Sequence, residues 1–299
     1  MRAVTESAPT GHAVPRTIAE LRGEAVRVLT AARIPTPEAD AELLIGHVLG
    51  LSRGQIQAKS LTGAGVDAEQ RLQVIEAVER RAAREPLQHI TGRAPFRMLE
   101  LAVGPGVFVP RPETESVAQI AIDALRAVAS PEPIAVDLGT GSGAIAIALA
   151  TEVPHAQVVA VENSPQAFIW TKQNARESGA DNLRLVFADL GVAVPELDGR
   201  VDVVVSNPPY IPLAAVPRDP EVRLFDPPAA LYAGEDGLDV VRSLSQRALA
   251  LLRPGGTLVI EHGELQGEQI RELLTADGWR AAATSRDLLG RDRATTALR

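Results

Sequence analysis

The chain has 299 residues, 45% of them hydrophobic and 23% charged, a balance typical of a water-soluble protein with a sizeable core. Its net charge of -8 disfavours a protein that works mainly on nucleic-acid phosphates. The absence of cysteine excludes disulfides and thiolate metal sites, and the histidines lack ligand spacing, so we expect no metal site. No stretch approaches the roughly 20 apolar residues of a membrane helix. Residues 1–15 lack the apolar core of a signal peptide, and we expect them to form a disordered tail on a cytoplasmic protein without membrane contact.

A helical domain is predicted at residues 16–92, and its helical pattern runs from Thr17 to about Arg84. Thr17 and Glu20 form a capping box, and apolar residues follow at helical spacing. Pro37 starts a second helix, because proline is favoured at the first helical position, and Asp67 starts a third. The segment contains no recognisable catalytic residue. Two interpretations stay open: a bundle with a structural role, or a domain that recognises a partner.

A linker is predicted at residues 93–112. Residues 86–92 break the helical pattern. Apolar residues then alternate between Leu99 and Val109 around Gly104-Pro105-Gly106, which predicts a hairpin. An amphipathic helix follows and opens the second domain, residues 113–299.

A glycine-rich turn begins that domain's first strand–turn–helix unit. The strand ends in Asp137-Leu138-Gly139-Thr140-Gly141-Ser142-Gly143, and an Ala/Ile helix follows at once. Glycines let the backbone approach a ligand, and this unit is typical of nucleotide-binding α/β folds. The next strand ends at Glu162, about 20 residues on, where an acid in such folds accepts hydrogen bonds from ribose hydroxyls. The spacing Gly-x-Gly-x-Gly departs from that of dinucleotide sites, and Asp137 would repel a phosphate but attract an ammonium. S-adenosylmethionine, which carries an ammonium and a sulfonium and no phosphate, therefore fits better.

The third strand ends before Asp189 and Leu190. Asp189 could accept a hydrogen bond from an adenine amino group while Leu190 packs on the ring; alternatively, Asp189 is an ordinary turn residue. A long loop at residues 223–239 could be a lid or substrate loop. A helix, a strand, another helix and a final hairpin complete the chain.

The fourth strand ends abruptly at Asn207-Pro208-Pro209-Tyr210, because proline cannot donate to a sheet ladder. We expect Asn207 to point into the ligand crevice at the carboxyl edge of the sheet. The Asn207 side-chain carbonyl and the Pro208 backbone carbonyl are acceptors, which suits holding an NH2 group by its hydrogens while its lone pair stays free. Tyr210 would supply an aromatic face. A plain strand-ending turn is the alternative.

With these residues the chain resembles the protein-(glutamine-N5) methyltransferases that modify bacterial peptide chain release factors. The resemblance covers nearly everything after the tail, including a helical segment whose Asp40-Ala41-Glu42-Leu43-Leu44 is similar to that of the family. The other segments that support it are Pro86 to Gly92, Val109-Pro110-Arg111-Pro112-Glu113-Thr114-Glu115, Asp137 to Gly143, Asn207 to Tyr210, Gly234-Glu235-Asp236-Gly237-Leu238 and Gly290-Arg291-Asp292-Arg293.

The resemblance implies an α/β fold: a seven-stranded, Rossmann-like methyltransferase sheet with one antiparallel strand, after a helical-bundle domain and a β-hairpin linker. It implies S-adenosylmethionine as donor and the glutamine of a release factor's Gly-Gly-Gln motif as acceptor. Two departures stand out: Glu162 where many members have Asp, and Asp226 where many have Glu.

Three sets of site residues follow. The predicted cofactor-binding residues are Asp137, Leu138, Gly139, Thr140, Gly141, Glu162, Asp189, Leu190 and Asn207. The predicted substrate-binding residues are Asn207, Pro208, Pro209 and Tyr210. The predicted catalytic residues are Asn207, Pro208 and Tyr210, which would act by orientation and electrostatics, since no general base is evident.

Three other functions fit parts of the sequence. An adenine-N6 methyltransferase needs the same grip on an NH2 group, with the base flipped out against Tyr210, but the chain shows no base-reading module. A non-enzymatic binding protein would not need intact glycines, and a dehydrogenase would need the dinucleotide spacing. We expect release factors as partners, no direct contact with nucleic acid, and a monomer.

Overall fold

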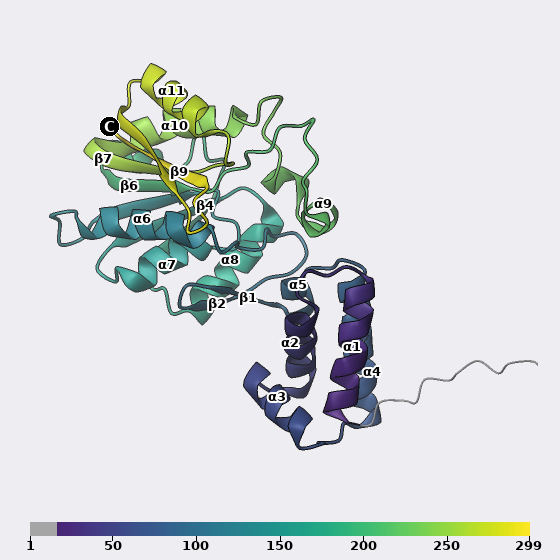
Figure 1. The fold of residues 1–299 in the computed structure, drawn as a ribbon. Coiled ribbons are helices and arrows are strands. Elements are labelled where there is room, and N and C mark those ends of the chain that lie inside the picture. Colours follow the sequence, from purple (N-terminus) through teal and green to yellow (C-terminus); the bar gives the residue numbers. More distant parts are fainter. Residues whose placement is uncertain (1–16) are drawn as a thin grey trace, which may run out of the picture. The chain divides into compact units, whose positions relative to one another are not determined.

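The computed structural model describes residues 17–299, so the predicted tail at residues 1–15 lies outside the described residues. The chain forms two compact units, a helical unit that ends at Thr91 and an α/β unit from Gly92 to Arg299 (Figure 1). None of the helices within residues 17–299 combines the length and apolar character that crossing a membrane requires.

The helical unit confirms the predicted helix starts. Its helices are α1 (Ile18–Ala31), α2 (Pro37–Leu49), α3 (Arg53–Leu61), α4 (Ala68–Ala82) and α5 (Leu87–Thr91). The capping box at Thr17 forms in full, and the side chain of Asp67 caps α4. Two helices were not predicted. Ser52 caps α3 through a second capping box, and α5 forms where residues 86–92 were expected only to break the pattern.

Two buried acids hold the helical unit together. Asp40 accepts a hydrogen bond from Arg81 Nε at 2.8 Å, and both side chains are buried. Glu42 is 1% exposed and accepts from Arg22 and Arg53, so its carboxylate is satisfied inside the bundle. These contacts give a structural reason for the acids in the Asp40–Leu44 segment.

The hairpin at the start of the α/β unit lies earlier than predicted. It pairs β1 (Arg93–Phe96) with β2 (Leu99–Ala102), so the turn is at Arg97 and Met98 and not at Gly104-Pro105-Gly106. Arg97 takes a left-handed φ of 54° there, and its guanidinium is held by the carboxylate of Glu152 at 2.5 and 2.9 Å. A long-range ion pair therefore fixes this turn, which local turn signals do not report.

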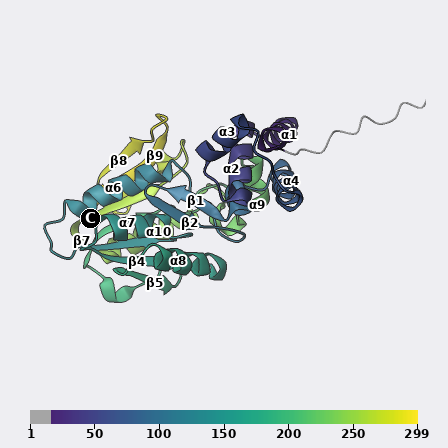
Figure 2. The ribbon, with the colours of Figure 1, turned by 90° about the horizontal axis from the view of Figure 1, so that it is seen from below.

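A seven-stranded sheet in the order β5-β4-β3-β6-β7-β9-β8 forms the α/β unit (Figure 2, in which β5 and β8 lie at opposite edges). Its strands are β3 (Ile134–Leu138), β4 (Gln157–Glu162), β5 (Leu183–Phe187), β6 (Val201–Ser206), β7 (Leu252–Glu261), β8 (Arg280–Arg286) and β9 (Asp292–Leu298). Only β9 runs against its neighbours among these strands. The predicted fold class, with one antiparallel strand, is confirmed.

Helices cover both faces of the sheet. They are α6 (Thr114–Arg126), α7 (Ala144–Glu152), α8 (Pro165–Glu177), α10 (Asp239–Leu251) and α11 (Gly267–Ala276). The short helix α9 (Pro220–Phe225) and the 3-10 turns η1 (Pro195–Leu197) and η2 (Pro228–Ala230) lie in the connections. Alternate strand residues face opposite cores. Ala135 packs with α6 and α7, whereas its neighbour Val136 packs with α10 and α11. Figure 1 shows α7 and α8 on one side of the sheet and α10 and α11 on the other.

The strand order reverses between β3 and β6. The chain builds β3, β4 and β5 outward in one direction and then returns to place β6 on the free side of β3. In open α/β sheets, ligands bind at the carboxyl ends of the strands at such a reversal. The glycine-rich turn after β3 and the Asn-Pro-Pro-Tyr turn after β6 therefore meet at one edge of the sheet.

Candidate active site

A cavity of about 1170 Å³ opens at this edge. Its lining includes the turns after β3 and β6, the segment 211–231, and Arg291 and Arg293 of the last hairpin. The volume exceeds the usual range for one small ligand, which is about 300–1,000 Å³. Two ligands, or one ligand and a protruding peptide loop, can occupy it together.

The turn after β3 is shaped to receive a ligand. Gly139 and Gly141 have φ of 75° and 61°, a region that disfavours side chains. A Cβ at either position would meet no protein atom within 4 Å, so the space beside both belongs to the cavity. The backbone is therefore open to close approach by a bound molecule.

Asp137 supplies the charge beneath this turn. Its Oδ2 accepts from the Thr140 hydroxyl at 2.6 Å and from the Ala146 N–H at 3.2 Å, whereas Oδ1 has no hydrogen-bond partner among the described residues. Burial, with a smaller contribution from the Glu162 charge, raises the pKa of Asp137 to about 7, and the hydrogen bonds from Thr140 and Ala146 oppose the rise. An ammonium group would satisfy the free oxygen and favour the ionised carboxyl, which fits the predicted donor.

Glu162 lies at the end of β4 and lines the cavity. Its carboxylate accepts backbone N–H groups from Gly141 at 2.8 Å, Asn163 at 3.0 Å and Ser164 at 2.8 Å. Burial raises its pKa, and these three bonds oppose the rise. A carboxylate offers about four acceptor positions, so Glu162 keeps about one for a ribose hydroxyl while it also shapes the glycine turn.

The other predicted cofactor residues divide into two groups. Thr140, Asp189 and Leu190 line the cavity, and Asp189 also makes the turn bond of the alternative interpretation, from Gly191 N–H to Oδ1 at 2.9 Å. Leu138 does not line it. Its side chain is fully buried in the core on the α10 side, and its carbonyl accepts from Ser206 Oγ at 2.5 Å.

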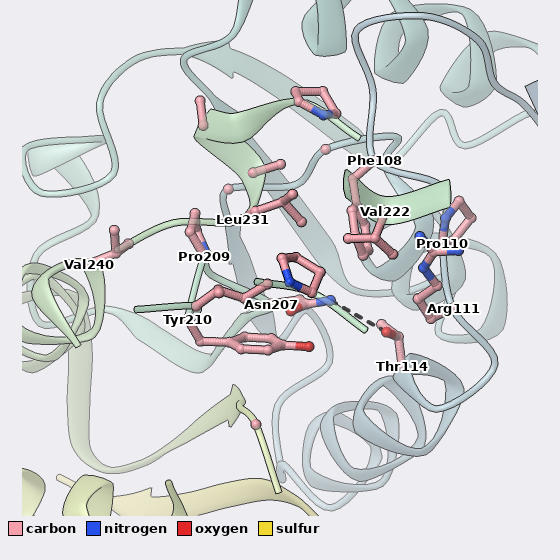
Figure 3. Close-up of a pocket in the computed structure, with 18 of the residues that line it drawn as sticks. Phe108, Pro110, Arg111, Thr114, Asn207, Pro209, Tyr210, Val222, Leu231 and Val240 are labelled. Carbon is pink, nitrogen blue, oxygen red and sulfur yellow. Dashed lines mark hydrogen bonds between the residues drawn. The ribbon is translucent and has the colours of Figure 1, made fainter. Parts of the chain in front are cut away.

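The Asn-Pro-Pro-Tyr turn places Asn207, Pro209 and Tyr210 on the cavity wall (Figure 3). Pro208 is buried and is not among the lining residues. The Asn207 Nδ2 donates to Thr114 Oγ1 at 3.4 Å. Burial raises the pKa of Tyr210 to about 12, so its phenol is neutral at physiological pH. The turn thus presents an amide, a proline ring and a neutral aromatic face to the cavity.

Two further contacts fix the position of this turn. The Tyr210 carbonyl accepts from Gln266 Nε2 at 2.9 Å. A Cβ at Gly237 would lie 2.4 Å from the same carbonyl, so a side chain at this position is excluded. Gly237 belongs to the Gly234–Leu238 motif, and this close approach gives that motif a structural reason.

Sequence reasoning missed two buried groups at the site. Thr114, the first residue of α6, is 3% exposed and touches Asn207. Glu261 ends β7 and is 1% exposed. An acid closing an apolar strand was a visible signal, as it was for Glu162. The sequence did not show that β7 lies beside β6.

The predicted loop at residues 223–239 is partly helical, since α9 and η2 lie within or beside it. Arg111 Nη2 donates to Asp226 Oδ2 at 2.6 Å, and its guanidinium lies 4.9 Å from the ring centre of Phe108. Burial raises the pKa of Asp226 to about 6, and the charge of Arg111 opposes the rise. Asp226 therefore anchors Arg111 beside the cavity, which assigns a contact to this departure from the family's usual Glu.

Within residues 17–299, no group of three or more His, Asp or Glu side chains could hold a metal ion. The chemistry of the lining is that of a buried carboxylate, open glycine backbone, and amide and carbonyl acceptors.

Comparison with known proteins identifies relatives over almost the whole chain. The family models for the PrmC N-terminal domain and for a methyltransferase domain match residues 20–92 and 131–287. A Streptomyces coelicolor protein named release factor glutamine methyltransferase is 52% identical, over 92% of this chain and 95% of the relative. A Bifidobacterium longum protein of the same name is 44% identical, over 92% and 97%. A Streptomyces pristinaespiralis protein named 4-amino-L-phenylalanine/4-methylamino-L-phenylalanine methyltransferase is 40% identical, over 90% and 91%.

Proposed function

Since the chain belongs to the release factor glutamine methyltransferase family, we propose that it methylates the side-chain nitrogen of the glutamine in the Gly-Gly-Gln motif of peptide chain release factors. The chain is an S-adenosylmethionine-dependent methyltransferase. The observation that supports the acceptor best is the Asn207–Tyr210 turn, which presents the Asn207 amide beside an aromatic face at the cavity wall. We place the reaction in the cytoplasm, where translation ends.

The donor is assigned to the turn after β3. Asp137 would pair with the ammonium, Gly139 and Gly141 would allow the backbone to approach the ligand, and Glu162 would accept from a ribose hydroxyl. Asp189 and Leu190 would face the adenine. When bound there, S-adenosylmethionine supplies a methyl carbon made electrophilic by the attached sulfonium.

The acceptor is assigned to the turn after β6. An amide nitrogen is a poor nucleophile because its lone pair is delocalised into the carbonyl. We propose that the Asn207 Oδ1 and the Pro208 carbonyl each accept one N–H of the glutamine amide, which raises electron density on nitrogen and fixes its direction. Tyr210 would pack against the flat amide, and the neutral, largely buried surroundings would exclude water.

A released proton completes the reaction. The new N–C bond would form as the carbon–sulfur bond of the donor breaks, which would leave a neutral thioether, and the nitrogen would give up one hydrogen as a proton. One of the two N–H groups held by the acceptor oxygens of Asn207 and Pro208 would lose this proton, and solvent would take it up.

A direct test is mass spectrometry of the intact release factor after incubation with the purified protein and S-adenosylmethionine. We expect one added methyl group, located by fragmentation on the glutamine of Gly-Gly-Gln. A release factor with alanine in place of that glutamine is the matched control and should gain none. Methylation of the control, or of another residue in the natural factor, would overturn the proposal.

A second acceptor class needs an arm in the same experiment. The Streptomyces pristinaespiralis relative is named for an aromatic amine on a free amino acid. A planar NH2 group on a flat ring could use the same Asn207 and Tyr210. The adenine-N6 alternative is not favoured, because the relatives are named for release factors or for an amino acid. If 4-amino-L-phenylalanine is methylated faster than the release factor, the preferred acceptor is the aromatic amine and not the glutamine.

A further inference from the structure

The buried acid Glu261 lies next to the turn Asn207–Tyr210, which is called the acceptor turn from here on. In the parallel pair of β6 and β7, Ser206 is aligned with Ile260. The next residue on each strand, Asn207 and Glu261, therefore lie next to each other at the carboxyl edge of the sheet. Neither the predicted mechanism nor the assigned donor site uses this carboxyl.

Glu261 contacts the groups that hold Asn207. The Thr114 hydroxyl and the Asn207 amide lie close enough to its carboxyl to lower its pKa as hydrogen-bond donors. The Asn207 Nδ2 also donates to Thr114 Oγ1, the bond drawn in Figure 3. The second carboxyl oxygen, Oε2, has no hydrogen-bond partner among the described residues. Asn207, Thr114 and Glu261 thus form one small polar cluster under the cavity wall.

A role in stability does not account for this acid. None of the ion pairs within 4 Å in the described part of the chain includes Glu261; the guanidinium of Arg293 instead donates to the His262 carbonyl and lies 3.6 Å from Asp287. A carboxylate buried without an ion pair costs free energy of folding. An apolar residue would pack this strand end at a lower cost, so the carboxylate has to act through its neighbours.

The chemistry of an asparagine side chain shows how it acts. The amide has a donor end, Nδ2, and an acceptor end, Oδ1, and rotation by half a turn exchanges them. A carboxylate only accepts, so only the NH2 end can face it. With Nδ2 turned to Glu261 and Thr114, the carbonyl oxygen of Asn207 is turned away from them.

We infer that Glu261 is a positioning residue: its carboxylate, together with the Thr114 hydroxyl, fixes the Asn207 amide so that Oδ1, and not Nδ2, faces the NH2 group of the acceptor. The inference rests on the proposed role of Asn207. A flipped amide would set a donor against a donor and would repel the acceptor's N–H groups. The cluster therefore gives a symmetric-looking amide a single productive orientation.

The charge state of Glu261 connects this orientation to pH. Burial raises the pKa of Glu261 to about 7, and hydrogen bonds from Thr114 and Asn207 and the charge of Arg293 oppose the rise. The other titratable groups facing it are Glu113, before α6, which raises the pKa, and Tyr210, which is neutral. Below about pH 7 the protonated carboxyl can donate to Oδ1, so the preference for one amide orientation is lost.

The side-chain amide of Asn207 reports the orientation without turnover. In nitrogen-15 spectra of the full-length protein, its two proton signals are assigned as those missing from Asn207→Ala. We expect them to shift with an apparent pKa near 7, and we expect Glu261→Gln to abolish that shift. The control is Glu272→Gln, an exposed acid on α11, which should titrate like the natural protein. Signals that do not titrate, or that titrate equally in Glu261→Gln, would overturn the inference.

Kinetics supply the second readout, with donor and acceptor saturating. We expect kcat of the natural protein to rise with pH through about 7, and Glu261→Gln to lower kcat about tenfold above that pH and to flatten the profile. Thr114→Val should lower kcat severalfold, and Thr114→Ser, which keeps the hydroxyl, should restore it. Donor affinity by calorimetry should stay unchanged in all of them.

The two proposals fail in different ways. If the natural protein leaves the glutamine unmethylated, the proposed function fails, but the amide titration still decides whether Glu261 orients Asn207. If the natural protein methylates glutamine and Glu261→Gln keeps both the kcat and the pH profile, the positioning role is wrong. If Glu261→Gln unfolds, the comparison of Thr114→Val with Thr114→Ser still tests whether the cluster positions Asn207.

Discussion

The turns after β3 and β6 lie on neighbouring strands and open into the same cavity, yet they are built from opposite materials. The first uses glycines with positive φ, whose open backbone admits a ligand closely. The second uses two prolines, which remove backbone donors and stiffen the chain. The glycine turn leaves open space beside the backbone, and the proline turn is proposed to present acceptors in a fixed direction.

Each turn has a buried acid beneath it. Asp137 supports the glycine turn and Glu261 supports the proline turn, and burial raises the pKa of both to about 7. Asp137 lines the cavity, and we propose that its charge faces the ammonium of the donor, whereas Glu261 is not among the lining residues and is proposed to act on Asn207. The comparison shows how a buried acid could serve two purposes: binding a ligand in one half of the site and positioning a neighbouring side chain in the other.

The largest expected effect comes from a substitution that impairs acceptor binding and leaves donor binding intact. Asn207→Ala removes one of the two proposed acceptors, and we expect kcat to fall on the order of a hundredfold or more. Donor affinity, measured by calorimetry, should remain close to that of the natural protein. Near-normal turnover in this variant would refute the role of Asn207.

The matching change in the donor half is Asp137→Asn. It keeps the shape and the partner Thr140 but removes the charge that we propose faces the ammonium. We expect donor affinity to fall about tenfold or more, with a much smaller change in kcat at saturating donor. In the natural protein, affinity should also weaken as pH falls below about 7, because the carboxyl becomes protonated. Equal calorimetric affinities for both proteins across this pH range would contradict the pairing.

The two acids should also be visible in stability. Folding raises the pKa of Asp137 from 3.8 and that of Glu261 from 4.5 to about 7. Between about pH 4 and pH 7 the folded protein therefore holds more protons than the unfolded one, so these groups cost stability as pH rises. As pH rises from 5 to 8, the free energy of unfolding of Asp137→Asn and of Glu261→Gln should increase by about 1 kcal/mol or more relative to that of the natural protein. Urea unfolding without donor measures this difference, and a pH-independent difference would be inconsistent with buried, titrating acids.

The smallest expected effect comes from substitutions of Tyr210, which separate the role of its aromatic face from that of its hydroxyl. Tyr210→Phe keeps the aromatic face and removes only a hydroxyl that is neutral at physiological pH, so we expect kcat within about twofold of the natural value. Tyr210→Leu removes the flat face and should cost about tenfold. Initial rates of peptide methylation separate the two outcomes. A large loss in Tyr210→Phe would assign chemistry to the hydroxyl.

Local signals predicted most of the sheet and both turns. The β3–turn–α7–β4 unit and the strand before Asn207 combine an apolar run with glycine or proline at its end, so they could be predicted from neighbouring residues alone. The start of α9 was also visible, because Asp219 caps it and Pro220 occupies its first position, but no helix was predicted there, and the end of α9 falls inside the loop predicted at residues 223–239. The sequence contained that signal, and it was overlooked.

Other features depend on the fold and could not be predicted from neighbouring residues. The hairpin turn at Arg97 is held by Glu152, 55 residues away in the chain. The contact between Glu261 and Asn207 requires β7 to lie beside β6 in one register. Leu138 was placed in the cofactor site by its position in a motif, whereas the alternation of the strand turns its side chain into the core.

The most direct measurement is a crystal structure with a Gly-Gly-Gln peptide and the demethylated donor product bound. The account predicts Asn207 Oδ1 and the Pro208 carbonyl each within about 3 Å of the glutamine amide nitrogen, with Asn207 Nδ2 turned to Glu261. An Asn207 side chain remote from that nitrogen, or one that presents Nδ2 to it, would contradict the central claim.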